Sequence, residues 1–117
     1  MKRPVSIRMP EDLGRGLRQL AAKRQMSVSQ LVAWVLGIAL RSNVDFSSLP
    51  DAQGWLTAKI DCRLPNDIIS QLRPVCKGLG VSPSVYIRTL MYAGQTGRLA
   101  IREFGGAYTL VANHEQK

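Results

Sequence analysis

Two stretches of the chain alternate between apolar and polar residues with a period of two. The apolar positions of these stretches are Val5, Ile7, Met9, Ile60, Cys62 and Leu64. Because successive side chains of a strand point to opposite faces, each stretch predicts a strand with one buried face. The outward positions are then Pro4, Ser6, Arg8, Lys59, Asp61 and Arg63.

A helical pattern follows each predicted strand. Pro10 and Pro65 end the strands and suit the first turn of a helix. Apolar residues then recur at helical spacing, as in Leu13, Leu17 and Leu20. Pro74 lies inside the second of these helices, where we expect it to kink the helix or end it early.

A further helix is predicted after each of these. Ser27 has the character of an N-cap, with Gln30 completing a capping box. Ser82 is the corresponding cap, followed by Pro83 at the first helical position. Residues 30–40 are apolar nearly all round, which predicts a helix at the centre of the core.

The two halves are an internal repeat with an offset of 55 residues and no gap. The matching residues are Arg8/Arg63, Pro10/Pro65, Asp12/Asp67, Leu17/Leu72, Arg18/Arg73, Ser27/Ser82 and Ser29/Ser84. Each unit is strand, helix, helix, and a single strand cannot satisfy its backbone groups alone. We therefore expect the two strands to pair antiparallel within one chain.

The predicted fold is mainly α, with a short two-stranded antiparallel ribbon. Its parts are a first repeat (1–41), a linker (42–56), a second repeat (57–97) and a C-terminal hairpin and tail (98–117), all in one compact domain. Gly105 and Gly106 mark the hairpin turn. We expect Trp34 in the core and Trp55 as an anchor of the linker, rather than either as a platform for stacked bases.

The charge balance favours a polyanionic partner. Sixteen Lys and Arg against eight Asp and Glu give a net charge of +8, and basic residues cluster in the first quarter of the chain. Nucleic acid leads the list of such partners, although solubility alone is an alternative reading.

The paired strands suggest how DNA is read, because a two-stranded ribbon fits the major groove. The candidates for base readout are Ser6, Arg8, Lys59, Asp61 and Arg63. Arg8 and Arg63 can each bind guanine through two hydrogen bonds, and Asp61 can accept from cytosine. The alternative is an ordinary solvated sheet face.

The starts of the second helices are candidates for holding phosphate, since helix N-termini offer free N–H groups. The residues at these starts are Ser27, Val28, Ser29, Ser82 and Ser84, and the basic residues Lys2 and Arg3 before the first strand are further candidates for phosphate contact. Pro83 has no N–H, so the second site should have one donor fewer. Ordinary N-capping explains the same serines without a partner.

Other classes of function find little support. Cys62, Cys76 and His114 are too few and badly spaced for a zinc site, and read better as apolar packing in a reduced cytoplasmic protein. Nothing resembles a catalytic set or a phosphate-binding glycine loop, so we expect neither an enzyme nor a cofactor. The longest apolar run, residues 31–40, is too short to span a bilayer, and no signal peptide is visible.

Residues 5–13 and 26–31, and more loosely their repeat, resemble the ribbon-helix-helix (MetJ/Arc) superfamily. Two copies in one chain are similar to the TraY-like proteins of conjugative plasmids. The resemblance implies a bacterial DNA-binding protein that regulates transcription or assists conjugation, with further copies of itself along the DNA as possible partners. An antitoxin or partition-type interaction module is the alternative.

The outward residues of the two strands differ. Pro4, Ser6 and Arg8 lie on one, and Lys59, Asp61 and Arg63 on the other. A homodimer with identical strands would read a palindrome. This chain is therefore expected to recognise an asymmetric site.

Overall fold

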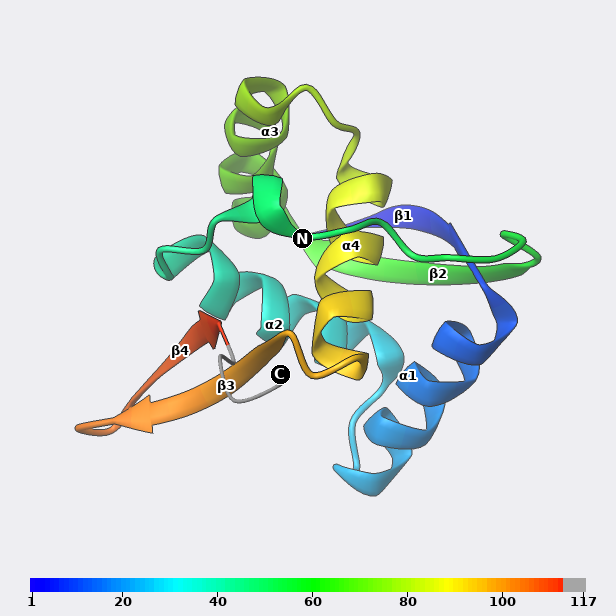
Figure 1. Ribbon diagram of the computed structural model, residues 1–117, viewed down its shortest axis with the longest axis horizontal. Coiled ribbons are helices and arrows are strands. Elements are labelled where there is room, and N and C mark those ends of the chain that lie inside the picture. The colour runs from blue at the N-terminus through cyan, green and yellow to red at the C-terminus, as the bar shows by residue number, and fades with distance from the viewer. Residues whose placement is uncertain (113–117) are drawn as a thin grey trace.

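The computed structural model describes residues 1–112, so His114 and the rest of the predicted tail lie outside the described residues. Within that range the fold is mixed α/β, with four α-helices, a short 3₁₀ turn and two antiparallel two-stranded sheets (Figure 1). The elements in chain order are β1 (Lys2–Met9), α1 (Glu11–Lys23), α2 (Val28–Arg41), the 3₁₀ turn (Phe46–Ser48), β2 (Ala58–Pro65), α3 (Asn66–Leu79), α4 (Pro83–Gln95), β3 (Leu99–Phe104) and β4 (Ala107–Ala112).

The predicted ribbon is present as the antiparallel pair β1–β2. Its register runs from Lys2 opposite Pro65 to Met9 opposite Ala58. The inner face is the one that the alternation predicts: Ile7, Met9, Ile60, Cys62 and Leu64 are buried, and Val5 is half-buried. Burial of these apolar side chains fixes the register, because a slip by one residue would expose all of them.

The helices begin where the capping signals place them. Pro10 and Pro65 stand in extended conformation directly before α1 and α3. The Ser27 hydroxyl accepts from the Gln30 amide at 3.0 Å, and the Gln30 side chain accepts from the Ser27 amide at 2.8 Å, which is the predicted capping box. Ser82 likewise accepts from the Val85 amide at 3.2 Å.

The two repeats exchange packing partners. Helix α2 of the first repeat packs on β2 of the second, and α4 of the second packs on β1 of the first. Figure 1 shows α4 crossing in front of the ribbon and α2 below it, with both helices between the ribbon and the second sheet. The α2 helix also contacts α1, α3 and β4, which confirms its predicted central position.

Three sequence expectations need correction or refinement. Pro74 does not end its helix, since α3 continues to Leu79; its missing N–H falls on the exposed side of the helix. Trp55 does not anchor the linker, because its side chain is 86% exposed. Trp34 is only half-buried and lies between Arg24, at 5.3 Å from the ring centre, and Tyr108.

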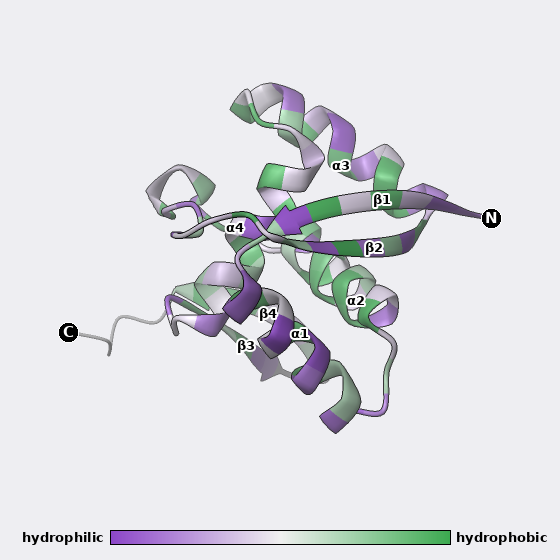
Figure 2. Ribbon diagram, turned by 90° about the vertical axis from the view of Figure 1, so that its right-hand side faces the viewer, coloured by the Kyte–Doolittle hydropathy of each residue, from purple (hydrophilic) through white to green (hydrophobic). Residues whose placement is uncertain are grey.

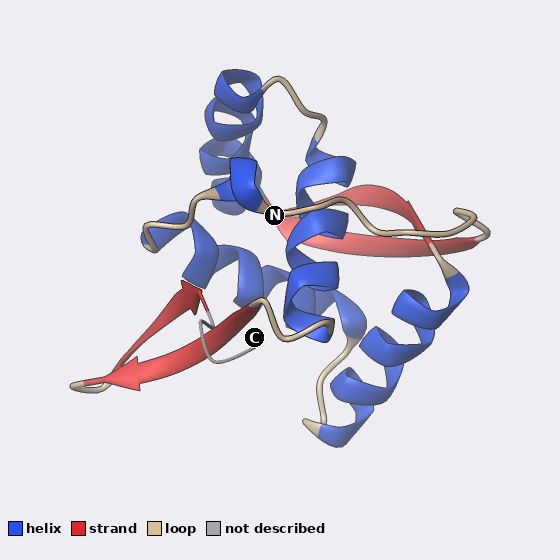
Figure 3. Ribbon diagram, viewed as in Figure 1, coloured by secondary structure: helices blue, strands red, loops and turns tan. Residues whose placement is uncertain are grey.

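The C-terminal hairpin β3–β4 forms as predicted, with Gly105 and Gly106 both at positive φ in its turn. It lies across α2 and α4 from the ribbon (Figure 3). The Ser42 hydroxyl at the end of α2 accepts from the Leu110 amide at 2.9 Å and fixes β4 there. In the described part of the chain, no helix is long and apolar enough to cross a membrane.

Candidate nucleic-acid interface

The outer face of the ribbon is polar and exposed along its whole length. All six outward residues predicted from the alternation are exposed: Pro4, Ser6, Arg8, Lys59, Asp61 and Arg63. Figure 2 views the molecule from the side on which the ribbon lies, and shows hydrophilic and hydrophobic residues alternating along both strands. No other element of the described chain covers this face, so its side chains are free to meet a partner.

The register gives this face an approximate two-fold symmetry. Ser6 pairs with Asp61, and the two are equivalent positions of the 55-residue repeat. The symmetry axis therefore passes through this pair. Arg8 lies beside Lys59 on one side of the axis, and Arg63 lies beside Pro4 on the other.

The central pair is held together by its own side chains. The Ser6 hydroxyl donates to the Asp61 carboxylate at 2.6 Å, and Lys59 Nζ lies 3.9 Å from the same oxygen. The side chains of Ser6 and Asp61, both predicted to contact bases, thus hold each other in fixed positions before any DNA is bound. The carboxylate remains accessible, with 70% of its side chain exposed.

A cleft lies beside the N-terminus of α2. It has a volume of about 390 Å³, and Lys2, Ser29, Gln30 and Arg63 are among its lining residues. Of the first amides of α2, that of Gln30 is taken by the Ser27 hydroxyl. Those of Val28 and Ser29 have no acceptor among the described residues, as is usual for a first helical turn. The cations Lys2 and Arg63 and the start of α2 at Ser29 thus line one cleft, a combination that suits a phosphate.

A smaller cleft lies beside the N-terminus of α4, on the opposite side of the ribbon. Its volume is about 290 Å³, and its polar lining comes from Arg3, Ser6, Arg73 and Ser84. Pro83 is the first residue of α4, so only Ser84 offers a free amide here. The α4 cleft therefore has cations comparable to those of the α2 cleft but one amide donor fewer.

The hydroxyls of Ser29 and Ser84 have a structural role in this fold. Ser29 accepts from the Arg63 amide at 2.9 Å, and Ser84 donates to the Ser6 carbonyl at 3.0 Å. Both bonds tie a helix start to the outer edge of the ribbon. What each serine offers to a ligand is then mainly its backbone amide, while Ser27 and Ser82 are engaged as caps.

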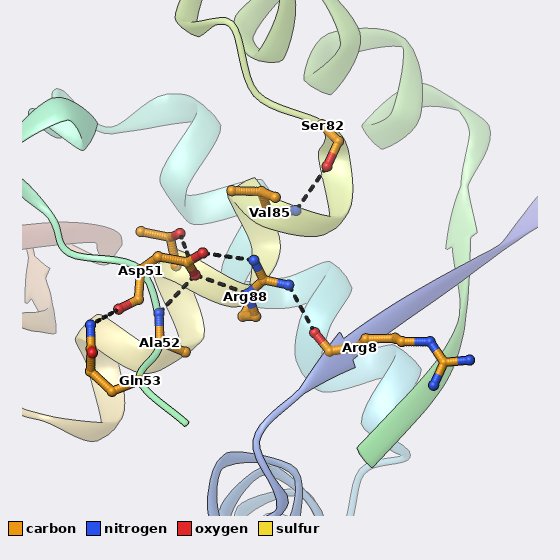
Figure 4. A network of polar contacts seen from close by, with 8 residues as sticks. Arg8, Asp51, Ala52, Gln53, Ser82, Val85 and Arg88 are labelled. Atoms are coloured by element: carbon orange, nitrogen blue, oxygen red, sulfur yellow. Dashed lines mark hydrogen bonds and ion pairs between the residues drawn. The ribbon is translucent and has the colours of Figure 1, made fainter. Parts of the chain in front are cut away.

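The linker contributes an ion pair that sequence reasoning missed. Arg88 of α4 donates to both carboxylate oxygens of Asp51, at 2.9 and 2.7 Å, and its third nitrogen donates to the Arg8 carbonyl at 3.1 Å. Figure 4 shows the Arg8 side chain pointing away from this network. Arg88 therefore fixes the backbone at one end of the ribbon and leaves the Arg8 guanidinium free.

Electrostatics keep both partners of this ion pair charged. The hydrogen bonds from Arg88 lower the pKa of Asp51, even though partial burial opposes the shift. The bonds to Asp51 in turn raise the pKa of Arg88. The Arg88 side chain is only 10% exposed, so the carboxylate compensates a nearly buried positive charge.

Arg73 and the Asp51–Arg88 ion pair were not predicted as parts of the interface, and they differ in how far the sequence pointed to them. Arg73 matches Arg18 in the repeat, which marked it as a shared position, but only the packing shows that it lines a cleft. Asp51 and Arg88 had no such signal, because a linker residue and a helix residue 37 positions apart share no local pattern.

No cluster of three or more potential metal ligands occurs among residues 1–112. Cys62 and Cys76 are free and buried. Burial, with the nearby Asp61 charge, raises the pKa of the Cys62 thiol to about 11. The thiol is therefore neutral at ordinary pH, and its role is packing beneath the ribbon.

No family model, curated protein or solved structure matches this chain.

Proposed function

We propose that this protein binds double-stranded DNA sequence-specifically, by laying the β1–β2 ribbon into the major groove. In this proposal the two strand-helix-helix units form a tandem ribbon-helix-helix pseudo-dimer. The observation that carries it is the register of the ribbon, which pairs equivalent repeat positions Ser6 and Asp61 at its centre. The exposed face of such a ribbon has approximate two-fold symmetry within one chain, and in this proposal it contacts the base edges of DNA.

The chemistry of this face suits base edges. Arg8 and Arg63 lie at equivalent positions on either side of the centre, and both are exposed. Each can bind guanine O6 and N7 through two hydrogen bonds, worth about 1–3 kcal/mol of discrimination. Lys59 beside Arg8 can also reach a guanine acceptor, and Asp61 can accept from cytosine N4.

The two clefts suit the phosphates that border the groove. They flank the ribbon on opposite sides and combine helix N-termini with cations that do not read bases in this proposal, Lys2 on one side and Arg3 and Arg73 on the other. Backbone contacts of this kind position a protein on DNA without reading its sequence. The α2 cleft has the extra amide and is the stronger phosphate site in this proposal.

The test is selection of binding sites from a pool of randomised duplexes, followed by titration of the selected duplex. We expect wild type to enrich one sequence with a guanine at each of two positions. Arg8→Ala and Arg63→Ala should each relax one position, and the double variant should lose both. An Arg41→Ala/Arg102→Ala variant removes the same charge from exposed positions outside the ribbon, and should keep the selected sequence.

Two outcomes would overturn the proposal. One is the absence of any enriched duplex. The other is a double variant that binds the enriched duplex as tightly as wild type does. The site itself should be asymmetric, because Lys59 is equivalent to Pro4. Equal affinity for the selected site and for a palindrome of either half would contradict that part.

The biological use of this binding follows from where the selected sequence occurs. In a promoter it would make the protein a transcriptional regulator in the bacterial cytoplasm. In the transfer origin of a mobile element it would make it an accessory factor in conjugation.

A further inference from the structure

Trp55 is an exposed aromatic side chain that the readout by the ribbon does not use. It is 86% exposed, and the next residue, Leu56, is 39% exposed. Two consecutive apolar side chains thus face outward from the linker. Burying an indole removes about 150–250 Å² of side-chain surface from water. A complex in which a partner covers Trp55 is therefore stabilised by this burial.

The linker presents these residues at one end of the ribbon. Trp55 precedes Ala58, the first residue of β2, by three residues, so their Cα atoms are at most about 11 Å apart. Ala58 pairs with Met9, and the next pair along the ribbon is Arg8 with Lys59. Figure 1 shows the linker turning back at this end before it enters β2. The backbone that carries the exposed indole is therefore close to the end of the ribbon that holds its most cationic pair.

The linker is held in place at this position. Asp51 is bound to Arg88, and Arg88 also binds the Arg8 carbonyl (Figure 4). Gly54 adopts a φ of +107° that strongly favours glycine, and a Cβ built there would be in ordinary contact with Pro10, 3.7 Å away. Loop and ribbon end are thus joined through a shared network, which lowers the entropy lost when Trp55 meets a partner.

The opposite end of the ribbon is built differently. There Lys2 pairs with Pro65, and the Asn66 amide donates to the Met1 carbonyl. The exposed residues at that end include the apolar Met1 and the cations Lys2 and Arg3, and none of these is aromatic. Only the Arg8–Lys59 end combines exposed cations with an exposed indole.

We infer that Trp55, with Leu56, is a second DNA contact that extends the recognised site beyond the Arg8–Lys59 end of the ribbon. The indole packs against deoxyribose of the flanking backbone, and its N–H donates to a phosphate. This inference rests on the proposed function. It makes the protected DNA longer on one side of the ribbon centre than on the other.

The test uses the selected duplex with longer flanks. We expect Trp55→Ala to weaken binding about tenfold, the change that corresponds to about 1.4 kcal/mol. A hydroxyl-radical footprint should shorten only on the flank next to the position read by Arg8. Tyr108→Ala is the matched control, since it removes a 45% exposed aromatic from the hairpin, and it should leave both measurements unchanged.

A direct signal comes from fluorescence in a Trp34→Phe background, where Trp55 is the single tryptophan. Its emission should change on addition of duplex with both flanks and stay constant with duplex trimmed on the Arg8 side. Thermal unfolding of Trp55→Ala should match wild type, because the side chain is exposed. That result separates a lost contact from a lost fold.

The failures are distinguishable. If wild type binds its duplex and Trp55→Ala binds it equally well with the same footprint, only this inference is overturned. If Trp55→Ala instead abolishes self-association measured by sedimentation without DNA, Trp55 is a contact between copies and the inference is wrong. If wild type enriches no duplex, the proposed function fails and this inference fails with it.

Discussion

The two repeats differ most where the first helix of each meets the ribbon. In the first repeat, a Cβ added at Gly14 of α1 would lie 3.2 Å from Ala58 Cβ, so this small pair lets helix and strand touch. The equivalent residues in the second repeat are Ile69 and Arg3, which line the α4 cleft of about 290 Å³. On one side of the ribbon, small residues let α1 contact β2 directly. On the other side, the α4 cleft remains open and is lined by the cations Arg3 and Arg73.

A second difference lies in the helices under the ribbon. Arg88 in α4 corresponds to Ala33 in α2, and only Arg88 has a partner in the linker. A dimer of identical chains would repeat such an ion pair on both sides. This chain has one linker, and uses it to fix one end of the ribbon. Similar backbones can therefore carry unequal surfaces when the two halves are free to differ in sequence.

The largest effect is expected from core truncations that compare how much equivalent leucines of the two repeats contribute to stability. Leu17 and Leu72 are identical residues at equivalent positions, with 6% and 1% exposure. Truncation of either to alanine should cost about 2–5 kcal/mol of unfolding free energy. Leu72→Ala should cost more, because Leu17 is the more exposed of the two and borders a groove of about 520 Å³, larger than the α4 cleft of about 290 Å³ that Leu72 borders. Urea unfolding measures both, and a larger loss for Leu17→Ala would contradict this account.

The ion pair of the linker should have the next largest effect. Asp51→Asn leaves the Arg88 charge uncompensated, and we expect a loss of about 1–3 kcal/mol, reduced from the fully buried case because Asp51 is half exposed. Adding Arg88→Ala should cost less than the sum of the single changes. Asp45→Asn is the control, since this linker carboxylate is exposed and makes no capping hydrogen bond to the 3₁₀ turn that follows it. Additive losses in the double variant would show that the pair is not coupled.

Glycine substitutions sharpen the contrast between the closed and open sides. Gly14→Ala should destabilise the protein, because its methyl group would press on Ala58 at 3.2 Å. Gly78→Ala, in α3, meets nothing within 4 Å and should stabilise by about 0.5–1 kcal/mol through helix propensity. Thermal unfolding checks the opposite signs. A stabilising Gly14→Ala would mean that α1 can move away from β2 at no cost.

The smallest effect is a dependence on pH. Since Arg88 lowers the pKa of Asp51 in the folded protein, the carboxylate stabilises the fold above its ordinary pKa of 3.8, and this contribution is lost as the pH falls through the lowered value. Wild type should therefore lose more stability than Asp51→Asn between about pH 6 and about pH 3. Identical acid titrations of the two proteins would rule out this contribution.

Much of the ribbon could be predicted from the sequence because its signals are local. Alternation identified the buried face, prolines marked the strand ends, and Ser27 with Gln30 marked a helix start. The offset of the repeat, combined with antiparallel pairing, then implies that equivalent residues meet near a common axis. The polar outer face followed from the same alternation.

The rest depends on contacts between residues far apart in the chain. Nothing near Asp51 indicates Arg88, and nothing near Ser29 indicates that its hydroxyl binds the Arg63 amide. Trp55 was misplaced because hydrophobicity predicts burial, whereas the short path of the linker into β2 leaves its side chain outside. Pro74 does not end its helix early, because one lost hydrogen bond on an exposed helix face does not outweigh the packing of Leu72 and Cys76 on either side of it.

Because the repeats exchange packing partners, joining them in one chain determines whether the fold survives at low protein concentration. Neither half can complete its core alone, because α2 packs on the strand of the second half and α4 on that of the first. In separate chains this assembly would be bimolecular and would come apart at low concentration. The linker instead keeps the halves at an effective concentration on the order of millimolar. The paired strands therefore persist even when the cell contains few copies of the protein.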